Sequence, residues 1–261
     1  MPGLAVQGIG VRFGGLVALD EVSLEVPPAT VVGVIGPNGA GKTTLFNIVC
    51  GFVRPDTGAI TWEDRPLRPR PQRLAAHGIA RTLQGVGLFA GLTVLENVMV
   101  GATPVARAGF ASALLGLPRS DDDERRLRAR ATDLLAELGV ADVAHRLPGA
   151  LPYPVQKRVA LARALVGEPR LLLLDEPAGG LGGEDMDDLG RIIRTLPERA
   201  GSGCAVMLVE HHMDLVMGVC DQVVVLDFGR VVARGTPAQV QADPVVATAY
   251  LGAEVPQQAG L

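Results

Sequence analysis

Hydrophobic and polar residues follow two kinds of pattern along the chain. Short, almost entirely apolar runs at Val31–Ile35, Leu171–Leu174 and Ala205–Val209 are typical of parallel strands that are buried on both faces of a sheet. Between these runs, apolar residues at helical spacing predict helices over residues 44–50, 93–100, 120–138, 158–166 and 185–196. The alternation of strands and helices predicts an α/β fold with a mostly parallel sheet and flanking helices.

The regions outside this alternating pattern are typical of β structure. Residues 4–30 contain short apolar pieces broken by glycine and proline, which predict a small antiparallel sheet that Ala59–Trp62 can join. The arginine and proline residues of 65–71 predict a solvated loop. Apolar pieces on either side of a Gly-containing turn predict a hairpin over 223–233, and Thr236-Pro237 is a typical helix start.

The loop after the first apolar run carries the clearest chemical motif. It fits the pattern G-x-x-x-x-G-K-[ST] and consists of Gly36, Pro37, Asn38, Gly39, Ala40, Gly41, Lys42, Thr43 and Thr44. Such a loop wraps backbone N–H groups around the phosphates of a nucleotide, and the helix that follows adds the partial positive charge of its N-terminus. Lys42 is expected to bridge phosphate oxygens, and the Thr43 hydroxyl to ligate Mg²⁺.

Two carboxylates follow the apolar run at 171–174. The carboxyl ends of strands in an open α/β sheet are where ligands bind, so Asp175 and Glu176 are expected beside the phosphate loop. There Asp175 would hold Mg²⁺ through water, and Glu176 would polarise the attacking water. The alternative is that both acids only begin a turn before Pro177.

Three more segments are candidates for contacts with a ligand or a partner. His211 follows the apolar run at 205–209 and can reach a γ-phosphate, whereas His212 is expected to point elsewhere. Phe13 either stacks on a nucleobase or fills the core. Residues 78–84 predict a strand, and the loop over 85–91 carries apolar residues that can meet a partner.

Composition narrows the class of protein. The 261 residues include 24 Lys and Arg and 28 Asp and Glu, so the net charge is −4, and the pI near 5.6 does not favour nucleic-acid binding. No uncharged apolar run reaches the roughly 18 to 20 residues of a membrane helix, and the start lacks the pattern of a signal peptide, so a cytosolic protein is expected. The separated cysteines Cys50, Cys204 and Cys220 are expected to be small buried hydrophobes.

These motifs, in this order, resemble the nucleotide-binding subunit of an ATP-binding cassette (ABC) transporter over essentially the whole chain. The matching positions are Phe13 as the adenine-stacking aromatic, Gly36–Thr44 as Walker A, Gln84 as the Q-loop glutamine, Leu151–Gln156 at the signature position, Leu171–Glu176 as Walker B and His211 as the switch histidine. Residues 81–84, 209–217 and 249–252 are similar to the ATPase subunits of branched-chain amino acid importers.

The resemblance implies an architecture and a set of partners. It divides the single nucleotide-binding domain into an antiparallel β subdomain (1–30 and 58–64), a RecA-like P-loop NTPase core (31–91 and 165–235), a helical subdomain (92–164) and a C-terminal helical tail (236–261). It implies ATP and Mg²⁺ as cofactors, with Gln84 assisting catalysis and ligating the metal. It also implies a peripheral position on the cytoplasmic face of the membrane, transmembrane permease subunits, a second ATPase subunit and, indirectly, a solute-binding protein.

One departure from the family pattern puts part of this function in doubt. The signature Leu-Ser-Gly-Gly-Gln is replaced by Leu151-Pro152-Tyr153-Pro154-Val155, which lacks the serine hydroxyl and one glycine N–H. Gly182 also stands where a polar D-loop residue is expected. We expect a poor signature that favours a heterodimer; the alternative is that Tyr153 and the helix dipole suffice.

Other functions share parts of this pattern. A soluble P-loop kinase would share the phosphate loop but lack the series Gln84, Asp175-Glu176 and His211. A cassette ATPase of DNA repair or translation would usually carry long coiled-coil insertions or a second cassette. A transporter of urea, of another solute or of exported lipid remains a further alternative, because the permease chooses the solute.

Overall fold

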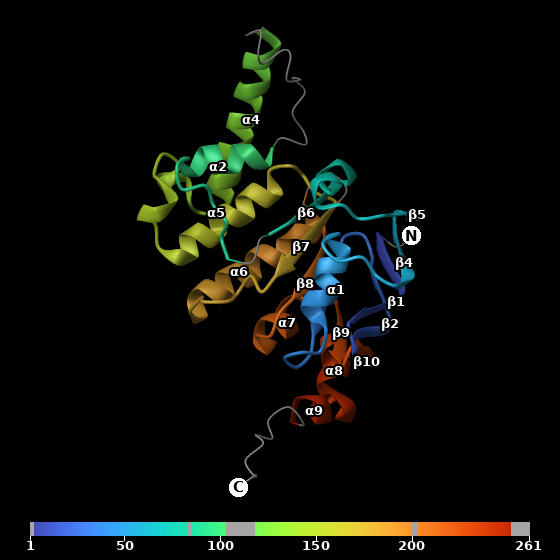
Figure 1. Ribbon diagram of the computed structural model, residues 1–261. Coiled ribbons are helices and arrows are strands. Elements are labelled where there is room, and N and C mark those ends of the chain that lie inside the picture. Colours follow the sequence, from blue (N-terminus) through green and yellow to red (C-terminus); the bar gives the residue numbers. More distant parts are fainter. Residues whose placement is uncertain (1–2, 83–84, 103–117, 200–202, 252–261) are drawn as a thin grey trace.

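The computed structural model describes residues 3–82, 85–102, 118–199 and 203–251. Two sheets lie side by side with a helix between them, and most of the other helices cover the opposite face of the larger sheet (Figure 1). The α/β class predicted from the sequence is confirmed. Among the described residues, no helix combines the length and the apolar character that a membrane span requires.

The smaller sheet is antiparallel. Its strand order is β2 (Leu16–Val26), β1 (Leu4–Phe13), β4 (Thr57–Trp62) and β5 (Arg65–Pro66). The antiparallel sheet predicted near the start of the chain, with residues 59–62 joining it, is therefore confirmed. The prediction of a solvated loop at 65–71 is wrong at its first residues, because Arg65 and Pro66 pair with Trp62 and Thr61.

The larger sheet has six strands and is mostly parallel. Their order is β10 (Arg230–Gly235), β9 (Gln222–Asp227), β3 (Val31–Ile35), β8 (Ala205–Val209), β7 (Leu171–Asp175) and β6 (Ile79–Arg81). Only β10 runs antiparallel to its neighbour, β9, as the predicted hairpin requires. Strand β6 is shorter than the strand predicted over 78–84, since only three of its residues pair with β7.

Eight α-helices and five 3₁₀ turns connect the strands within the described residues. The helices are α1 (Lys42–Val49), α2 (Val94–Gly101), α4 (Pro118–Glu137), α5 (Tyr153–Leu165), α6 (Gly183–Thr195), α7 (Met213–Val219), α8 (Pro237–Ala242) and α9 (Pro244–Leu251). The 3₁₀ turns are η1 (Pro71–Arg73), η2 (Ala75–His77), η4 (Ala141–Val143), η5 (Pro148–Ala150) and η6 (Leu196–Glu198). We refer to α2, α4 and α5 together as the helical region.

Several of these helices begin earlier than predicted. Helix α4 begins at Pro118, before the start expected at Ser120, and α1, α5 and α6 begin two to five residues before their predicted starts. The first turn of a helix tolerates proline and glycine, because its N–H groups have no partner within the helix. Because Pro154 and Gly183 are tolerated in first turns, the starts of α5 and α6 were predicted too late in the sequence. Thr93 and Thr236 form capping boxes, and α8 begins as predicted.

The alternation of side chains along the larger sheet explains why its strands are apolar throughout. Leu171 and Leu173 of β7 belong to a core shared with α1 and the antiparallel sheet, whereas Leu172 and Leu174 belong to a core shared with the helical region. Burial on both faces leaves no position for a polar residue until the strand ends. As predicted, Cys50, Cys204 and Cys220 are buried and unpaired.

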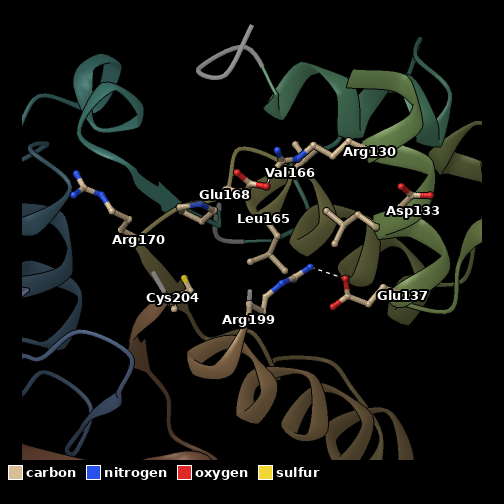
Figure 2. Close-up of a pocket in the computed structure, with 12 residues that line it drawn as sticks. Arg130, Asp133, Glu137, Leu165, Val166, Glu168, Arg170, Arg199 and Cys204 are labelled. Atoms are coloured by element: carbon tan, nitrogen blue, oxygen red, sulfur yellow. Dashed lines mark hydrogen bonds and ion pairs between the residues drawn. The ribbon is translucent and has the colours of Figure 1, made fainter. Parts of the chain in front are cut away.

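The helical region joins the sheet around a cavity of about 750 Å³ (Figure 2). Two ion pairs on the rim of the cavity connect α4 to segments beside the sheet. They are Arg130 of α4 with Glu168 at 2.6 Å, and Glu137 of α4 with Arg199 at 2.5 Å. The cavity also reaches Cys204, just before β8, so it lies at the amino ends of the central strands. This is the end of the sheet opposite to the phosphate loop.

Inside the helical region, α2 and α5 approach each other closely at Gly101. A Cβ atom at this position would lie 1.9 Å from the carbonyl oxygen of Arg163. We therefore expect Gly101→Ala to push the two helices apart and to cost about 1 to 3 kcal/mol in the free energy of unfolding. This corresponds to a fall in Tm of about 2 to 12 °C by thermal denaturation.

Gly91→Ala is the matched control, because a Cβ at Gly91 would have no neighbour within 4 Å. Equal melting temperatures for the two variants would contradict the close contact.

Candidate functional site

The predicted site residues come from the carboxyl ends of three adjacent parallel strands. The phosphate loop follows β3, Glu210 and His211 follow β8, and Asp175 and Glu176 end and follow β7. Because β8 lies between β3 and β7, these segments meet at one edge of the larger sheet.

The phosphate loop is shaped by glycines at positions where a side chain would not fit. Gly36 has φ 147°, and a Cβ there would lie 2.0 Å from the carbonyl oxygen of Leu226. Gly41 has φ 100° and packs against Leu19 of β2. Helix α1 then begins at Lys42. Among the described residues, the N–H groups of Lys42 and Thr43 donate no hydrogen bond. The loop therefore presents free donors, as a phosphate cradle requires.

Lys42 is a buried cation without an acidic partner among the residues that the structure describes. Its side chain is 7% exposed, and its Nζ donates hydrogen bonds to the carbonyls of Gly36 (2.7 Å) and Pro37 (2.9 Å). No carboxylate of the described residues lies within ion-pair distance of it. Burial lowers the pKa of Lys42, and the negative charge of Glu176 opposes this effect. An anion such as a phosphate group fits this site, because it would supply the missing counter-charge.

The carboxylates at the end of β7 form an acidic edge opposite the lysine. Burial raises the pKa of Asp175; the charges of Glu176 and Glu210 raise it further, and Arg81 opposes them. A divalent cation with oxygen ligands fits this group of like charges. Glu176 has φ 46°, which is unusual for a residue other than glycine, and its side chain is 39% exposed. The backbone thus holds Glu176 in a strained conformation of the kind that clusters at functional sites.

His211 lies close to this acidic edge. Its Nδ1 atom is 3.8 Å from Oε1 of Glu176 and 3.5 Å from Oε2 of Glu210. The His212 ring lies beside it, with the centroids of the two imidazole rings 4.3 Å apart, and the expectation that His212 does not reach the γ-phosphate stays a prediction. The strand has already ended at Val209, so the alternation of side chains no longer separates neighbours.

Glu210 was not singled out by the sequence analysis. It is fully buried, and its carboxylate accepts hydrogen bonds from the N–H groups of Ala178 (2.9 Å), His211 (2.7 Å) and His212 (3.0 Å). Glu210 therefore fixes the backbone on both sides of the site. An acid directly after a buried strand is the same signal that identified Asp175, and it would have found Glu210 as well.

Lys157 of α5 ties the helical region to the acidic edge. Its Nζ donates to the carbonyl oxygens of Pro177 (2.7 Å) and Glu176 (3.4 Å). Burial lowers the pKa of Lys157, opposed by the charges of Glu210 and Glu176. A lysine inside an amphipathic helix carries no motif, so no sequence signal pointed to this contact.

Phe13 and Gln84 are the remaining predicted site residues. Phe13 is 50% exposed at the end of β1, so the alternative that it fills the core is wrong. Gln84 lies outside the described residues. Its near neighbours Thr82 and Gly85 line a small pocket together with Asp175 and Glu176. The hydroxyl oxygen of Thr82 is buried there without a hydrogen-bond partner among the described residues.

The signature position forms the first turn of α5. Pro152 is the N-cap residue, with no side-chain hydrogen bond, and Pro154 is the second residue of the helix. Of the four N–H groups that a helix leaves free at its start, only those of Tyr153 and Val155 exist here. Tyr153 packs on Gly180, since a Cβ at Gly180 would lie 3.0 Å from its ring.

Comparisons with protein families agree with this geometry. The family model described as ABC transporter matches residues 19–179, and the model described as Branched-chain amino acid ATP-binding cassette transporter matches residues 230–256. The chain belongs to the ABC transporter family. It is therefore a nucleotide-binding ATPase coupled to transport, and the alternative of a soluble P-loop kinase is excluded.

Individual relatives extend over almost the whole chain. It is similar to the high-affinity branched-chain amino acid transport ATP-binding proteins LivG of Salmonella typhimurium strain LT2 (41% identity) and BraF of Pseudomonas aeruginosa (40%), with 96% of this chain and 98% of each relative covered. Among solved structures, the ADP conformation of MJ1267, an ATP-binding cassette of an ABC transporter, superimposes with a TM-score of 0.82 at 29% identity. That match covers 97% of this chain and 99% of MJ1267.

The acidic edge leads to a prediction about stability. Without a bound cation, Asp175→Asn removes one of several like charges, so we expect it to stabilise the nucleotide-free protein by about 1 kcal/mol, or roughly 2 to 4 °C in Tm. The same variant should gain less stability from MgATP than the natural protein, because a neutral amide is a weaker ligand for Mg²⁺. Thermal denaturation with and without MgATP measures both effects.

Asp187→Asn, which changes an exposed acid of α6, is the control and should leave both quantities unchanged. A loss of stability in nucleotide-free Asp175→Asn would contradict the repulsion inferred at this edge.

Proposed function

We propose that this protein is the ATP-binding and ATP-hydrolysing subunit of an importer for branched-chain or other hydrophobic amino acids. The observation that carries the nucleotide site is the buried Lys42, which has carbonyl partners but no carboxylate within ion-pair distance among the described residues. The solute class is supported by the similarity to relatives whose names specify branched-chain amino acid transport. No part of this chain is expected to touch the solute.

Each residue of the site has its own role in ATP binding or hydrolysis. Lys42 and the free N–H groups of the loop hold the phosphates of ATP, and Phe13 stacks on the adenine. Thr43, Gln84 and, through water, Asp175 would hold Mg²⁺, which would neutralise charge on the phosphates. Glu176 accepts a proton from the attacking water while Lys157 holds the backbone carbonyl of Glu176, and His211 donates toward the γ-phosphate.

The loop before α2 is the part that we assign to the transmembrane permease subunits. Asn97 is buried and fixes this loop, because its Oδ1 accepts from the N–H of Phe89 (2.8 Å) and its Nδ2 donates to the Phe89 carbonyl (3.1 Å). The Phe89 side chain is left 52% exposed beside Arg163. A fixed, exposed aromatic ring is a suitable anchor for a helix of a partner. This contact would place the subunit on the cytoplasmic face of the membrane, with the solute-binding protein on the other side.

The amino acid uptake of an assembled transporter tests the proposed function. We expect cells or proteoliposomes that contain this chain, its permease subunits, a second ATPase subunit and the solute-binding protein to take up leucine in an ATP-dependent manner. Glu176→Gln should abolish uptake while the protein still binds ATP, because binding depends on Lys42 and only hydrolysis needs the carboxylate. Lys42→Ala should lose both, as measured by leucine uptake and by nucleotide binding. Normal leucine uptake with Glu176→Gln would refute the role of this residue.

A second ATPase subunit is part of this proposal. In the family, two subunits enclose ATP between the Walker site of one and the signature of the other, and hydrolysis releases the closed dimer. Pro152 and Pro154 leave only two N–H groups at the start of α5, so this chain offers its partner few donors. We therefore propose a heterodimer in which the partner supplies an intact signature to Lys42 and Glu176.

The heterodimer leads to a prediction about the isolated subunit. Purified homodimer should hydrolyse ATP slowly, and the triple change Pro152→Ser, Pro154→Gly and Val155→Gln should raise the rate severalfold, because it restores a hydroxyl and two N–H donors. Adding Glu176→Gln to the triple variant is the control and should return the rate to background. Rapid hydrolysis by the natural homodimer, with no gain in the triple variant, would argue against this pairing.

A further inference from the structure

Two neighbouring imidazoles lie side by side at the end of β8, although the proposed reaction uses only one of them. The ring centroids of His211 and His212 are 4.3 Å apart, and the rings are inclined at 36°. His211 is half-exposed and His212 partly exposed, so both can reach a dissolved ion. Imidazole nitrogens are preferred ligands of Zn²⁺ and of other borderline divalent metals.

A buried carboxylate, that of Glu210, lies next to the two histidines. Glu210 accepts three backbone N–H groups, two of which belong to the histidines themselves. Oε2 accepts the N–H groups of both histidines and Oε1 accepts that of Ala178, so of the roughly four acceptor positions of the carboxylate one remains for a cation, on Oε1. The same hydrogen bonds hold the backbone of both histidines in place, which prepares the three side chains for a common ligand.

The distances between the possible ligand atoms suit a small cation. One atom from each of Glu210, His211 and His212 lies within 4.8 Å of the other two, and Nδ1 of His211 is 3.5 Å from Oε2 of Glu210. A tetrahedral zinc ion with bonds of about 2.0 to 2.1 Å holds its ligand atoms about 3.4 Å apart. Side-chain rotations that shorten separations of up to 4.8 Å to about 3.4 Å close the site.

We propose that Glu210, His211 and His212 bind a borderline divalent metal ion, with Zn²⁺ as the representative ion and water as the fourth ligand. Mg²⁺ is a poor occupant of this site, because it prefers octahedral oxygen ligands and rarely takes imidazole. The site is therefore distinct in its chemistry from the magnesium site assigned to Thr43 and Asp175.

Binding at this site has a consequence for hydrolysis, and this consequence rests on the proposed function. Oε1 of Glu176 lies 3.8 Å from Nδ1 of His211, so an ion held by His211 engages the switch imidazole next to the catalytic carboxylate. Zn²⁺ then inhibits ATP hydrolysis without displacing the nucleotide from Lys42. Mg²⁺ at its own site thus supports ATP hydrolysis, whereas Zn²⁺ at the two histidines inhibits it.

Metal binding to the nucleotide-free protein tests the site independently of any ATPase activity. Co²⁺ is the spectroscopic probe, because four-coordinate Co²⁺ bound to nitrogen absorbs visible light strongly and Zn²⁺ displaces it. We expect one equivalent of Co²⁺ to bind, to be displaced by Zn²⁺, and to stay bound in millimolar Mg²⁺. His212→Gln should weaken binding by about tenfold or more, since it removes one of three ligands. His145→Gln, which removes an exposed histidine elsewhere on the surface, should have no effect.

The inhibition is measured on the assembled transporter with buffered free Zn²⁺. The natural subunit should lose ATPase activity as Zn²⁺ fills the site, whereas His212→Gln should keep its basal rate and resist inhibition. The proposal is overturned if Co²⁺ binds with no defined stoichiometry, if the two histidine variants bind it equally, or if Zn²⁺ inhibits His212→Gln as strongly as the natural protein. A chain that binds Co²⁺ as expected but supports no ATPase activity refutes the proposed function and leaves the metal site standing.

Discussion

The structure depends on charges that are held at one sheet edge without full compensation. Within the described part of the chain, Lys42 is buried with only carbonyl oxygens as partners, and Asp175, Glu176 and Glu210 gather at the ends of the neighbouring strands. Only Glu210 is well satisfied, by three backbone N–H groups. A folded protein keeps such an arrangement when a ligand completes it, because buried charge is costly unless it is paired. A nucleotide phosphate fits the missing partner of Lys42 and a divalent cation fits that of the carboxylates, and the strained Glu176 belongs to the same edge.

The rest of the fold serves to hold this edge in place. Strands β3, β8 and β7 are buried on both faces, so the segments that follow them have little freedom to shift. The antiparallel sheet supports the phosphate loop through Leu19, which packs against Gly41. The helical region reaches the same edge through Lys157, whose hydrogen bonds to the carbonyls of Glu176 and Pro177 connect α5 to the backbone that follows β7. Lys157, which follows the signature positions, thus contacts the backbone carbonyls of Glu176 and Pro177 within one subunit.

Sequence patterns predicted the sheet and the phosphate loop well, because both depend on local signals. Apolar runs locate β3, β7 and β8, and the glycine positions of the loop follow from backbone geometry that only glycine accepts. Helix starts were predicted less well, since Pro118, Pro154 and Gly183 occupy first turns that tolerate them. The contacts of Lys157 depend on how distant segments pack, and the pairing of the His211 and His212 rings depends on the backbone conformation after β8. No local pattern encodes such contacts, which is why they emerged only from the structure.

The cavity between α4 and the sheet separates the helical region from the sheet at that end. The two ion pairs on its rim, Arg130 with Glu168 and Arg199 with Glu137, have partly exposed side chains, so each contributes about 0 to 1 kcal/mol. By contrast, α2 and α5 are locked together at Gly101, where there is no room for a methyl group. The contact at Gly101 is steric and does not depend on charge. Raising the ionic strength therefore screens the two ion pairs on the cavity rim and leaves the packing of α2 on α5 unchanged.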